Sequence, residues 1–314
     1  MSCPSICHTT PAIVRFVNKE RLKSLAGDMR PKHYSSHLAV DEFLIEHGHR
    51  YCTIIIDADT GELLYLEKGK NKEQLIHFFR WAGDDSMSHV KAIAMDMNTN
   101  YSQTVKDLYP SIDIVYDTFH IIKWYNDQVV DRLRRQEAAI KDGRNPDDVS
   151  RKRTDNADSR AAILSSNEKI QNAVKAREEL SDILSIVNPS QMRTKLEDWS
   201  KLYSSVGISQ LTRFTRTVTN RMDGIVSRAT FRISSGKIEG VNSFIKALRR
   251  SAFGYQDFDY FAYLIWEQTH KDSLYGKPTD GSSGRHYSRK NPYNQKRLKQ
   301  TIFRLPDDGN KKAV

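Results

Sequence analysis

Three aspartates stand at the same place in the local pattern, each directly after a short apolar run. Asp41 follows the run at residues 38–40, Asp96 follows residues 92–95, and Asp117 follows residues 112–116. A carboxylate at the end of a buried strand is costly to desolvate unless a cation or strong donors compensate it. If the three strands are neighbours in a mixed sheet, their carboxylates meet at one edge and must take up protons or metal ions. Mg²⁺ fits best, because it prefers oxygen ligands.

Each aspartate also has a purely structural interpretation. Asp41 could pair with a basic side chain, and Asp96 could turn the chain before the next helix. Asp117 could cap the helix that follows it. The common pattern favours a shared site over three separate explanations.

A further carboxylate lies on a helix that the apolar spacing predicts over residues 237–250. One face of this helix combines the acid with a polar and basic track, made up of Glu239, Asn242, Lys246, Arg249 and Arg250. Such a track would hold a phosphodiester backbone beside metal-binding acids. The alternative is an ordinary solvated face, with Glu239 stabilised by the helix dipole.

The elements that must position these side chains follow an order of three strands and then alternating helices and strands. The pattern predicts strands over residues 37–45, 51–56, 62–67, 91–95 and 112–116, with helices over 72–81, 100–109 and 119–137. Between residues 143 and 228 the periodicity indicates helices and no strand. We therefore expect an α/β fold: a mixed five-stranded sheet with flanking helices, interrupted by an all-helical insertion.

Composition and charge narrow the class of protein. The chain has 314 residues, of which 38% are hydrophobic and 28% charged, as expected of a soluble globular protein. No apolar run approaches the roughly 20 residues that a membrane helix needs, so we expect no membrane partner. A formal net charge of +10 favours nucleic acid as a partner, although it could simply aid solubility. Three cysteines indicate a reducing compartment, and Cys3 and Cys7 supply at most half of a zinc site.

Several separated motifs together resemble the DDE-type insertion-sequence transposases of the ISL-three group. The matching stretches are AVDEF at 39–43, HGHRY at 47–51, AMDMN at 94–98 with Tyr101, DTFHI at 117–121, and SGKIEGVNSFIKALRR at 235–250 with Gly254 and Tyr255. The resemblance covers about residues 36–268 and implies a ribonuclease-H-like catalytic core. By motif, Asp41, Asp96 and Glu239 match the catalytic and metal-binding acids. Asp117 and His120 match an accessory motif that could position a metal or DNA, or brace the fifth strand.

The chemistry that this resemblance implies is phosphoryl transfer on double-stranded DNA. Two Mg²⁺ ions, with Mn²⁺ as a substitute, would support cleavage at the ends of the element and joining to target DNA. Asn242, Lys246, Arg249 and Arg250 would bind DNA. We expect a homo-oligomer on DNA in the bacterial cytoplasm, associated with the nucleoid when bound. The alternatives are a catalytically silent DNA-binding regulator and a metal-dependent nuclease without strand transfer.

The resemblance divides the chain into five parts. Residues 1–35 are expected to be a linker or the remnant of a DNA-binding region, 36–142 the first part of the catalytic core, and 143–228 the helical insertion. Residues 229–270 complete the core, and 271–314 form a basic flexible tail. Family members usually carry a zinc module and a helix-turn-helix segment ahead of the core, whereas forty residues precede Asp41 here. A shortened reading frame that does not recognise the element ends unaided is therefore one expectation.

Overall fold

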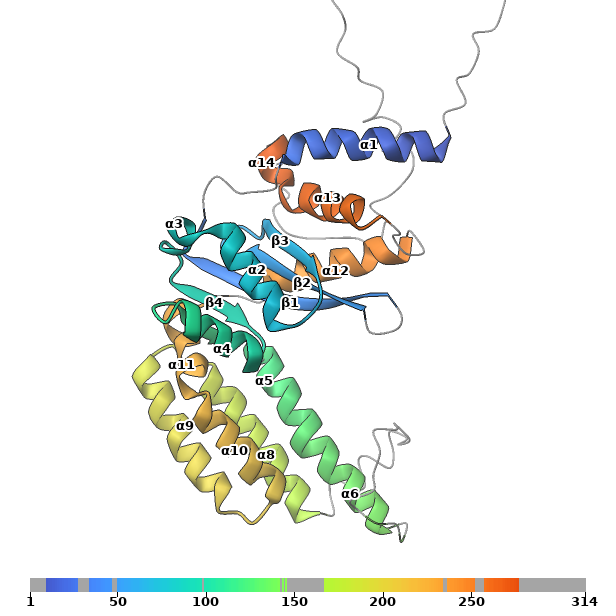
Figure 1. The fold of residues 1–314 in the computed structure, drawn as a ribbon. Helices are drawn as coiled ribbons and strands as arrows, with labels where there is room; N and C mark the ends of the chain where they lie inside the picture. The colour runs from blue at the N-terminus through green and yellow to red at the C-terminus, as the bar shows by residue number, and fades with distance from the viewer. Residues whose placement is uncertain are drawn as a thin grey trace, which may run out of the picture.

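A five-stranded sheet with the order β3-β2-β1-β4-β5 forms the centre of the molecule (Figure 1). The computed structural model describes residues 10–27, 34–46, 50–97, 99–141, 143, 145, 167–233, 236–251 and 257–276. The strands are β1 (His37–Glu46), β2 (Arg50–Asp57), β3 (Leu63–Lys68), β4 (Ala92–Met95) and β5 (Asp113–Tyr116). The expected mixed sheet and the order of its elements are confirmed.

The pairing of β1 differs on its two sides. β1 runs antiparallel to β2 from Leu38 to Glu46, but its parallel pairing with β4 covers only residues 37–39. β1 therefore continues past the end of its parallel neighbour, because β2 still supplies hydrogen-bonding partners there. Asp41 therefore lies within β1 and opposite Ile54, in agreement with the predicted strand over residues 37–45, and it does not end a strand as the apolar run at residues 38–40 indicated.

The described residues form helices on both faces of the sheet and a helical bundle beyond it. They are α1 (Pro11–Ala26), α2 (Lys72–Ala82), α3 (Asp84–Met87), α4 (Thr99–Leu108), α5 (Thr118–Tyr125), a π-helical turn η1 (Asn126–Val130), α6 (Asp131–Lys141), α8 (Glu168–Leu184), α9 (Pro189–Ser204), α10 (Ser209–Asn220), α11 (Met222–Phe231), α12 (Gly236–Ser251), α13 (Phe258–Thr269) and α14 (Lys271–Tyr275). One core joins α2, α4 and α5 to the sheet, and a second joins α12, α13 and α1 to the other face. Side chains of β1 alternate between them, with Leu38 and Val40 in the first core and Ala39 and Phe43 in the second.

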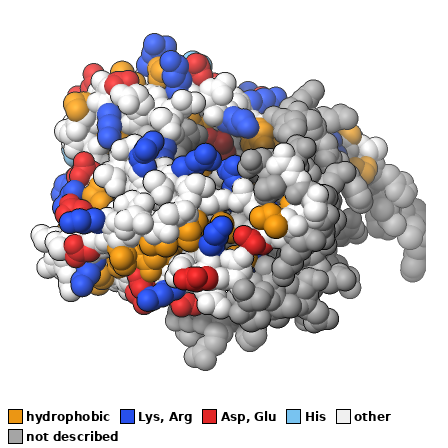
Figure 2. All heavy atoms as spheres, turned by 90° about the horizontal axis from the view of Figure 1, so that it is seen from below, with side chains coloured by type: hydrophobic (Ala, Val, Ile, Leu, Met, Phe, Trp, Pro, Cys, Tyr) orange, Lys and Arg blue, Asp and Glu red, His pale blue; other side chains and the backbone are white. Residues whose placement is uncertain are grey.

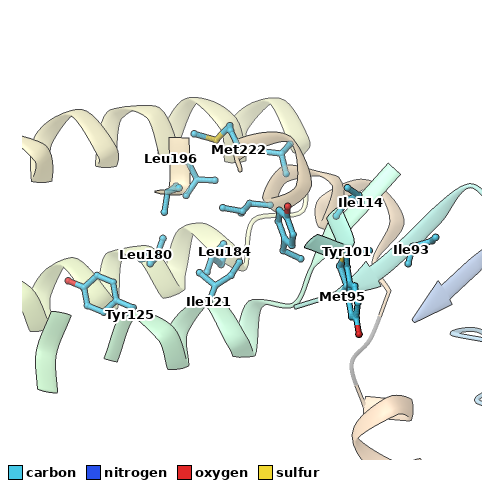
Figure 3. Packing of buried hydrophobic residues seen from close by; sticks show 14 of the residues in the cluster. Ile93, Met95, Tyr101, Ile114, Ile121, Tyr125, Leu180, Leu184, Leu196 and Met222 are labelled. Atoms are coloured by element: carbon cyan, nitrogen blue, oxygen red, sulfur yellow. The ribbon is translucent and has the colours of Figure 1, made fainter. Parts of the chain in front are cut away.

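The helices of the insertion, α8 to α11, continue the first core beyond the sheet. Figure 3 shows Ile121 and Tyr125 of α5 facing the apolar side chains of α8 and α9. The Tyr125 hydroxyl donates to the Ala173 carbonyl oxygen at 2.7 Å, which ties α5 to α8. The expected single helix over residues 119–137 is instead α5, the π-helical turn and the start of α6. In the predicted insertion, residues 143–228, the described residues 167–228 form α8, α9, α10 and most of α11 with short connections between them and no strand, as the periodicity indicated.

The N-terminal helix α1 was not indicated by the sequence pattern. α1 packs on α13, where the Lys19 ammonium lies 2.8 Å from the Asp257 carboxylate. Only Leu22 of this helix is fully buried, while Ile13 and Phe16 remain more than half exposed. The apolar side chains of α1 therefore do not mark one inward stripe, and periodicity alone did not predict the helix.

Some expectations fall on residues outside the described ranges. These are the possible half zinc site at Cys3 and Cys7, residues 47–49 of the HGHRY motif, Gly254 with Tyr255, and residues 277–314 of the expected flexible tail. The start of that tail is not extended chain, because residues 271–275 form α14. Within the described ranges, no helix combines the length and apolar character needed to cross a bilayer.

Candidate active site

The three aspartates lie in one row across β1, β4 and β5. Ala39 of β1 pairs with Ala94 of β4, and Ala94 pairs with Val115 of β5. Asp41, Asp96 and Asp117 each stand two residues after a member of this row. Side chains two residues apart point to the same face of a strand. Asp96 and Asp117 directly follow β4 and β5, and all three carboxylates line one pocket with Ile238 of α12.

These aspartates share one pocket. Its lining includes Asp41, Asp96, Asp117 and His120, with Ala39, Ala94 and Val115 as small residues beneath them. Ile233 and Ile238, on either side of the start of α12, complete the apolar part of the wall. The sheet register thus brings together three aspartates that lie up to 76 positions apart in the sequence.

His120 connects two of the three carboxylates. Its Nδ1 lies 2.5 Å from Asp96 Oδ1 and 3.1 Å from Asp117 Oδ2. Hydrogen bonds to Asp117 and Asp96 raise the pKa of His120 to about 10, so the imidazole is protonated at neutral pH. His120 therefore places a positive charge between the two acids.

Asp117 also caps the helix that carries His120. Its Oδ1 accepts a hydrogen bond from the Phe119 N–H at 2.9 Å, at the first turn of α5. Burial favours the neutral carboxyl, but the hydrogen bonds from His120 and from the Phe119 N–H outweigh it and lower the pKa of Asp117. The capping interpretation of Asp117 is confirmed, and the accessory role of Asp117 and His120 stays a prediction.

Asp41 lies in a different environment at the other end of the row. Its carboxylate accepts a hydrogen bond from the Glu42 N–H at 2.7 Å and another from the Asn242 amide of α12. Burial raises the pKa of Asp41, and the negative charge of Asp96 raises it further against the lowering effect of these donors and of His120. This carboxylate lacks a close cationic partner among the described residues.

The sequence interpretation placed Asn242 wrongly. This residue lies beside Asp41 of the pocket. We expected it on the DNA-binding face, whereas its side chain is 9% exposed and donates to Asp41. Residues 238, 241, 242 and 245 repeat at helical spacing, so Asn242 belongs to the inward stripe of α12. That spacing could have indicated its burial. Its Oδ1 is buried without a hydrogen-bond partner among the described residues.

Glu239 lies one turn before Asn242 on the same helix, and it is exposed to solvent. It is not part of the pocket lining, although its neighbour Ile238 is. Among the described residues, no three His, Cys, Asp or Glu side chains are grouped so that they could hold a metal ion. The set of Asp41, Asp96 and Glu239 as metal ligands therefore stays a prediction, of which two members line the pocket.

The basic residues of α12 divide into two kinds. Lys246 and Arg250 are exposed, as a DNA contact requires. The Arg249 guanidinium instead donates to the Leu44 carbonyl oxygen and fastens α12 to β1. All three remain predicted DNA contacts, with Lys246 and Arg250 the more accessible.

Comparisons with known proteins show what this chain is similar to. The family model described as a transposase, of the DDE type and the ISL3 (ISL-three) group, matches residues 38–265. A transposase for insertion sequence element IS1001 from Bordetella parapertussis is 29% identical over 266 residues, which are 79% of this chain and 64% of that relative. A transposase for insertion sequence element IS1557 from Mycobacterium tuberculosis is 22% identical over 255 residues, which are 70% of this chain and 56% of that relative.

The chain thus spans somewhat less than two thirds of the length of these relatives. The family match covers more than half of the chain, and it includes all the residues that line the pocket. The protein belongs to the ISL3 group of DDE-type transposases.

Proposed function

We propose that this chain cuts and joins DNA strands at the ends of an insertion sequence, using divalent metal ions at the pocket beneath α12. The observation that carries the proposal is the row of Asp41, Asp96 and Asp117, which the register of β1, β4 and β5 brings together. The match to a transposase family supports the same function. DNA is the substrate that the family and the basic charge both favour.

The residues of the pocket fit a hard divalent cation. Asp41 and Asp96 offer carboxylate oxygens, and the buried Oδ1 of Asn242 is an orphaned acceptor beside Asp41. Oxygen donors of this kind are the ligands that Mg²⁺ prefers, and Mn²⁺ accepts them as well. Asp41 and Asp96 would hold the metal, with Glu239 as the third ligand from α12. Bound there, Mg²⁺ ions would polarise the scissile phosphate and lower the pKa of an attacking water.

The chain's own residues prepare this site in three ways. Asn242 orients the Asp41 carboxylate through its amide N–H. His120 fixes Asp96 and compensates its charge. Lys246 and Arg250 lie exposed on α12, where they would contact phosphates on either side of the cut and bind DNA without reading its sequence.

The test is cleavage of a labelled duplex carrying the nucleotide sequence that flanks this reading frame, in Mg²⁺ and in EDTA. We expect Mg²⁺-dependent nicks at one position, and joined products when target DNA is added. Asp41→Asn, Asp96→Asn and Glu239→Gln should each reduce cleavage by more than about 100-fold, because even partners that only orient metal ligands cost 10- to 100-fold. Asp113→Asn is the matched control, since Asp113 is an exposed aspartate at the opposite end of β5.

The outcomes separate the alternatives. Cleavage without joined products would assign a nuclease without strand transfer. DNA binding without any cleavage by the unmodified chain would assign a regulator. Cleavage that survives the Glu239→Gln change would remove Glu239 from the ligand set and leave the two aspartates.

A further inference from the structure

Helix α10 of the insertion has two chemically distinct faces. Leu211, Phe214 and Val218 are buried in the bundle. On the outer side, Arg213, Arg216 and Asn220 are exposed and Thr217 is partly exposed. Residues 213, 216, 217 and 220 repeat at intervals of three and four, so they form one stripe along the helix. We call these four residues the α10 stripe.

The charge of the α10 stripe sets it apart from the neighbouring helices. No Asp or Glu occurs between residues 208 and 221, whereas α8 alone carries Glu168, Glu178, Glu179 and Asp182. Neither Arg213 nor Arg216 forms an ion pair with another residue of the described ranges. On the face of the molecule seen in Figure 2, Lys and Arg side chains form a row across the middle. Two uncompensated guanidinium groups beside a hydroxyl and an amide are suited to phosphate oxygens.

The C-terminal end of α10 lies next to the segment that follows Asp96 of the pocket. Arg221, the residue that follows α10, donates to the Met97 carbonyl oxygen at 3.2 Å and to Thr99 Oγ1 at 2.8 Å. Met97 and Thr99 belong to the segment directly after Asp96. The C-terminal end of α10 is thus fastened to the loop that follows a pocket aspartate, and the rest of the helix extends away from it along the insertion (Figure 1).

We propose that the α10 stripe binds the sugar–phosphate backbone of the DNA flank next to the strand that enters the pocket. The inference rests on the proposed function, because it assumes that the pocket acts on DNA. The α10 stripe, from residue 213 to residue 220, is about 10 Å long, which equals roughly three base pairs of duplex. The insertion therefore extends the DNA-binding surface beyond α12 and contributes affinity without sequence recognition.

The test measures binding of the full chain to a fluorescent 30-base-pair duplex in EDTA over a range of salt concentrations. Arg213→Gln combined with Arg216→Gln should weaken binding about tenfold or more at low salt. It should also reduce the slope of log K against log salt by about 2, since each lost phosphate contact changes that slope by about 0.9. Both side chains are exposed, so the melting temperature should not change.

The matched control removes the same charge from a different helix of the insertion. This control combines Lys169→Gln with Lys175→Gln. Both lysines are exposed on the acid-rich α8. We expect a change of salt slope below 0.5 for this control. Equal effects of the two double variants would show that only net charge matters and would overturn the α10 stripe as a binding surface.

The two proposals fail in different ways. A chain that binds the duplex with an α10-dependent salt slope but never cleaves it contradicts the proposed catalysis and leaves the surface intact. A chain that cleaves in Mg²⁺ with an unchanged slope in the Arg213 and Arg216 variant contradicts the surface alone. A chain that binds no duplex contradicts both.

Discussion

The two ends of the aspartate row differ although they share residue type, register and sheet face. Asp41 at the β1 end is covered by α12 and contacts the neutral amide of Asn242. Asp117 at the β5 end contacts the protonated His120 and the first turn of α5. Burial acts on both carboxyls, yet the pKa of Asp41 is raised and that of Asp117 is lowered. Deeper burial and the negative charge of Asp96 act on Asp41, whereas His120, the Phe119 N–H and the charge of Arg228 act on Asp117.

This difference indicates how the row divides its work. A buried carboxylate that lacks a cationic partner gains most from a bound cation, so we expect the metal on the side of Asp41. Asp117 already has its counterion in His120, which in turn holds Asp96. We therefore expect the β5 end to act as a support and a metal ion at the β1 end to add charge compensation.

Among the variants that compare the two ends of the row, the largest expected effect comes from removing the neutral partner of Asp41. Asn242→Ala should weaken Mn²⁺ binding, measured by electron paramagnetic resonance, by about 10- to 100-fold, because the carboxylate loses the donor that orients it and the site loses an amide oxygen. Ser243→Ala, an exposed neighbour on the same helix, is the control. If Mn²⁺ affinity stays the same while the melting temperature falls, Asn242 is only a packing residue.

The next effect concerns the support of the β5 end. A methyl group at Gly224 of α11 would lie 2.5 Å from the ring of Tyr116, the residue before Asp117. Gly224→Ala should therefore lower stability by about 1–3 kcal/mol, as overpacking does, and shift the melting temperature downward by several degrees. Gly240→Ala on α12 meets nothing within 4 Å and should raise stability by about 0.5–1 kcal/mol. Two changes of the same sign would show that α11 yields to the added methyl group without strain.

A smaller effect tests the cation of the β5 end directly. His120→Gln should reduce stability at pH 6 by about 1.5 kcal/mol, because a charge-assisted hydrogen bond is lost while an amide can still donate. The folded pKa of His120 is raised from 6.5 to about 10, so its contribution is complete below pH 6.5 and is lost as the pH rises through about 10. The unfolding free energies of the unmodified chain and of the His120→Gln variant, measured with denaturant, should therefore converge as the pH rises from 6 to 10. Parallel curves would mean that the imidazole is neutral throughout.

Much of this arrangement could be predicted from the sequence, for physical reasons that particular residues illustrate. The apolar runs before Asp41, Asp96 and Asp117 are local patterns, and the order of strands and helices along the chain follows from the spacing of apolar residues. The capping role of Asp117 was among the alternatives, because a strand-to-helix junction has few other uses for an aspartate.

What the sequence did not predict depends on contacts between distant segments. Asn242 lies 201 positions from Asp41, and only the approach of α12 to β1 makes it a partner of that carboxylate. The bridge from His120 to Asp96 similarly needs β4 and β5 side by side. The helix α1 was missed because its apolar side chains stay largely exposed and so produce no clear stripe.

The smallest effect compares the two ends of the row by their acid titration. Asp41 has a folded pKa above its ordinary value of 3.8, so the stability that it contributes is complete below pH 3.8 and is lost as the pH rises through the higher folded value. Asp117 has a folded pKa below 3.8, so its contribution is present above pH 3.8 and is lost as the pH falls through the lower value. We expect the difference in unfolding free energy between the unmodified chain and Asp41→Asn to fall with rising pH from about 3 to 6 in EDTA. The corresponding difference for Asp117→Asn should rise over the same range. Slopes of the same sign would mean that the neutral amide of Asn242 stabilises a carboxylate as well as His120 does, and the contrast between the two ends would then come from the helices that cover them and not from the charge of their partners.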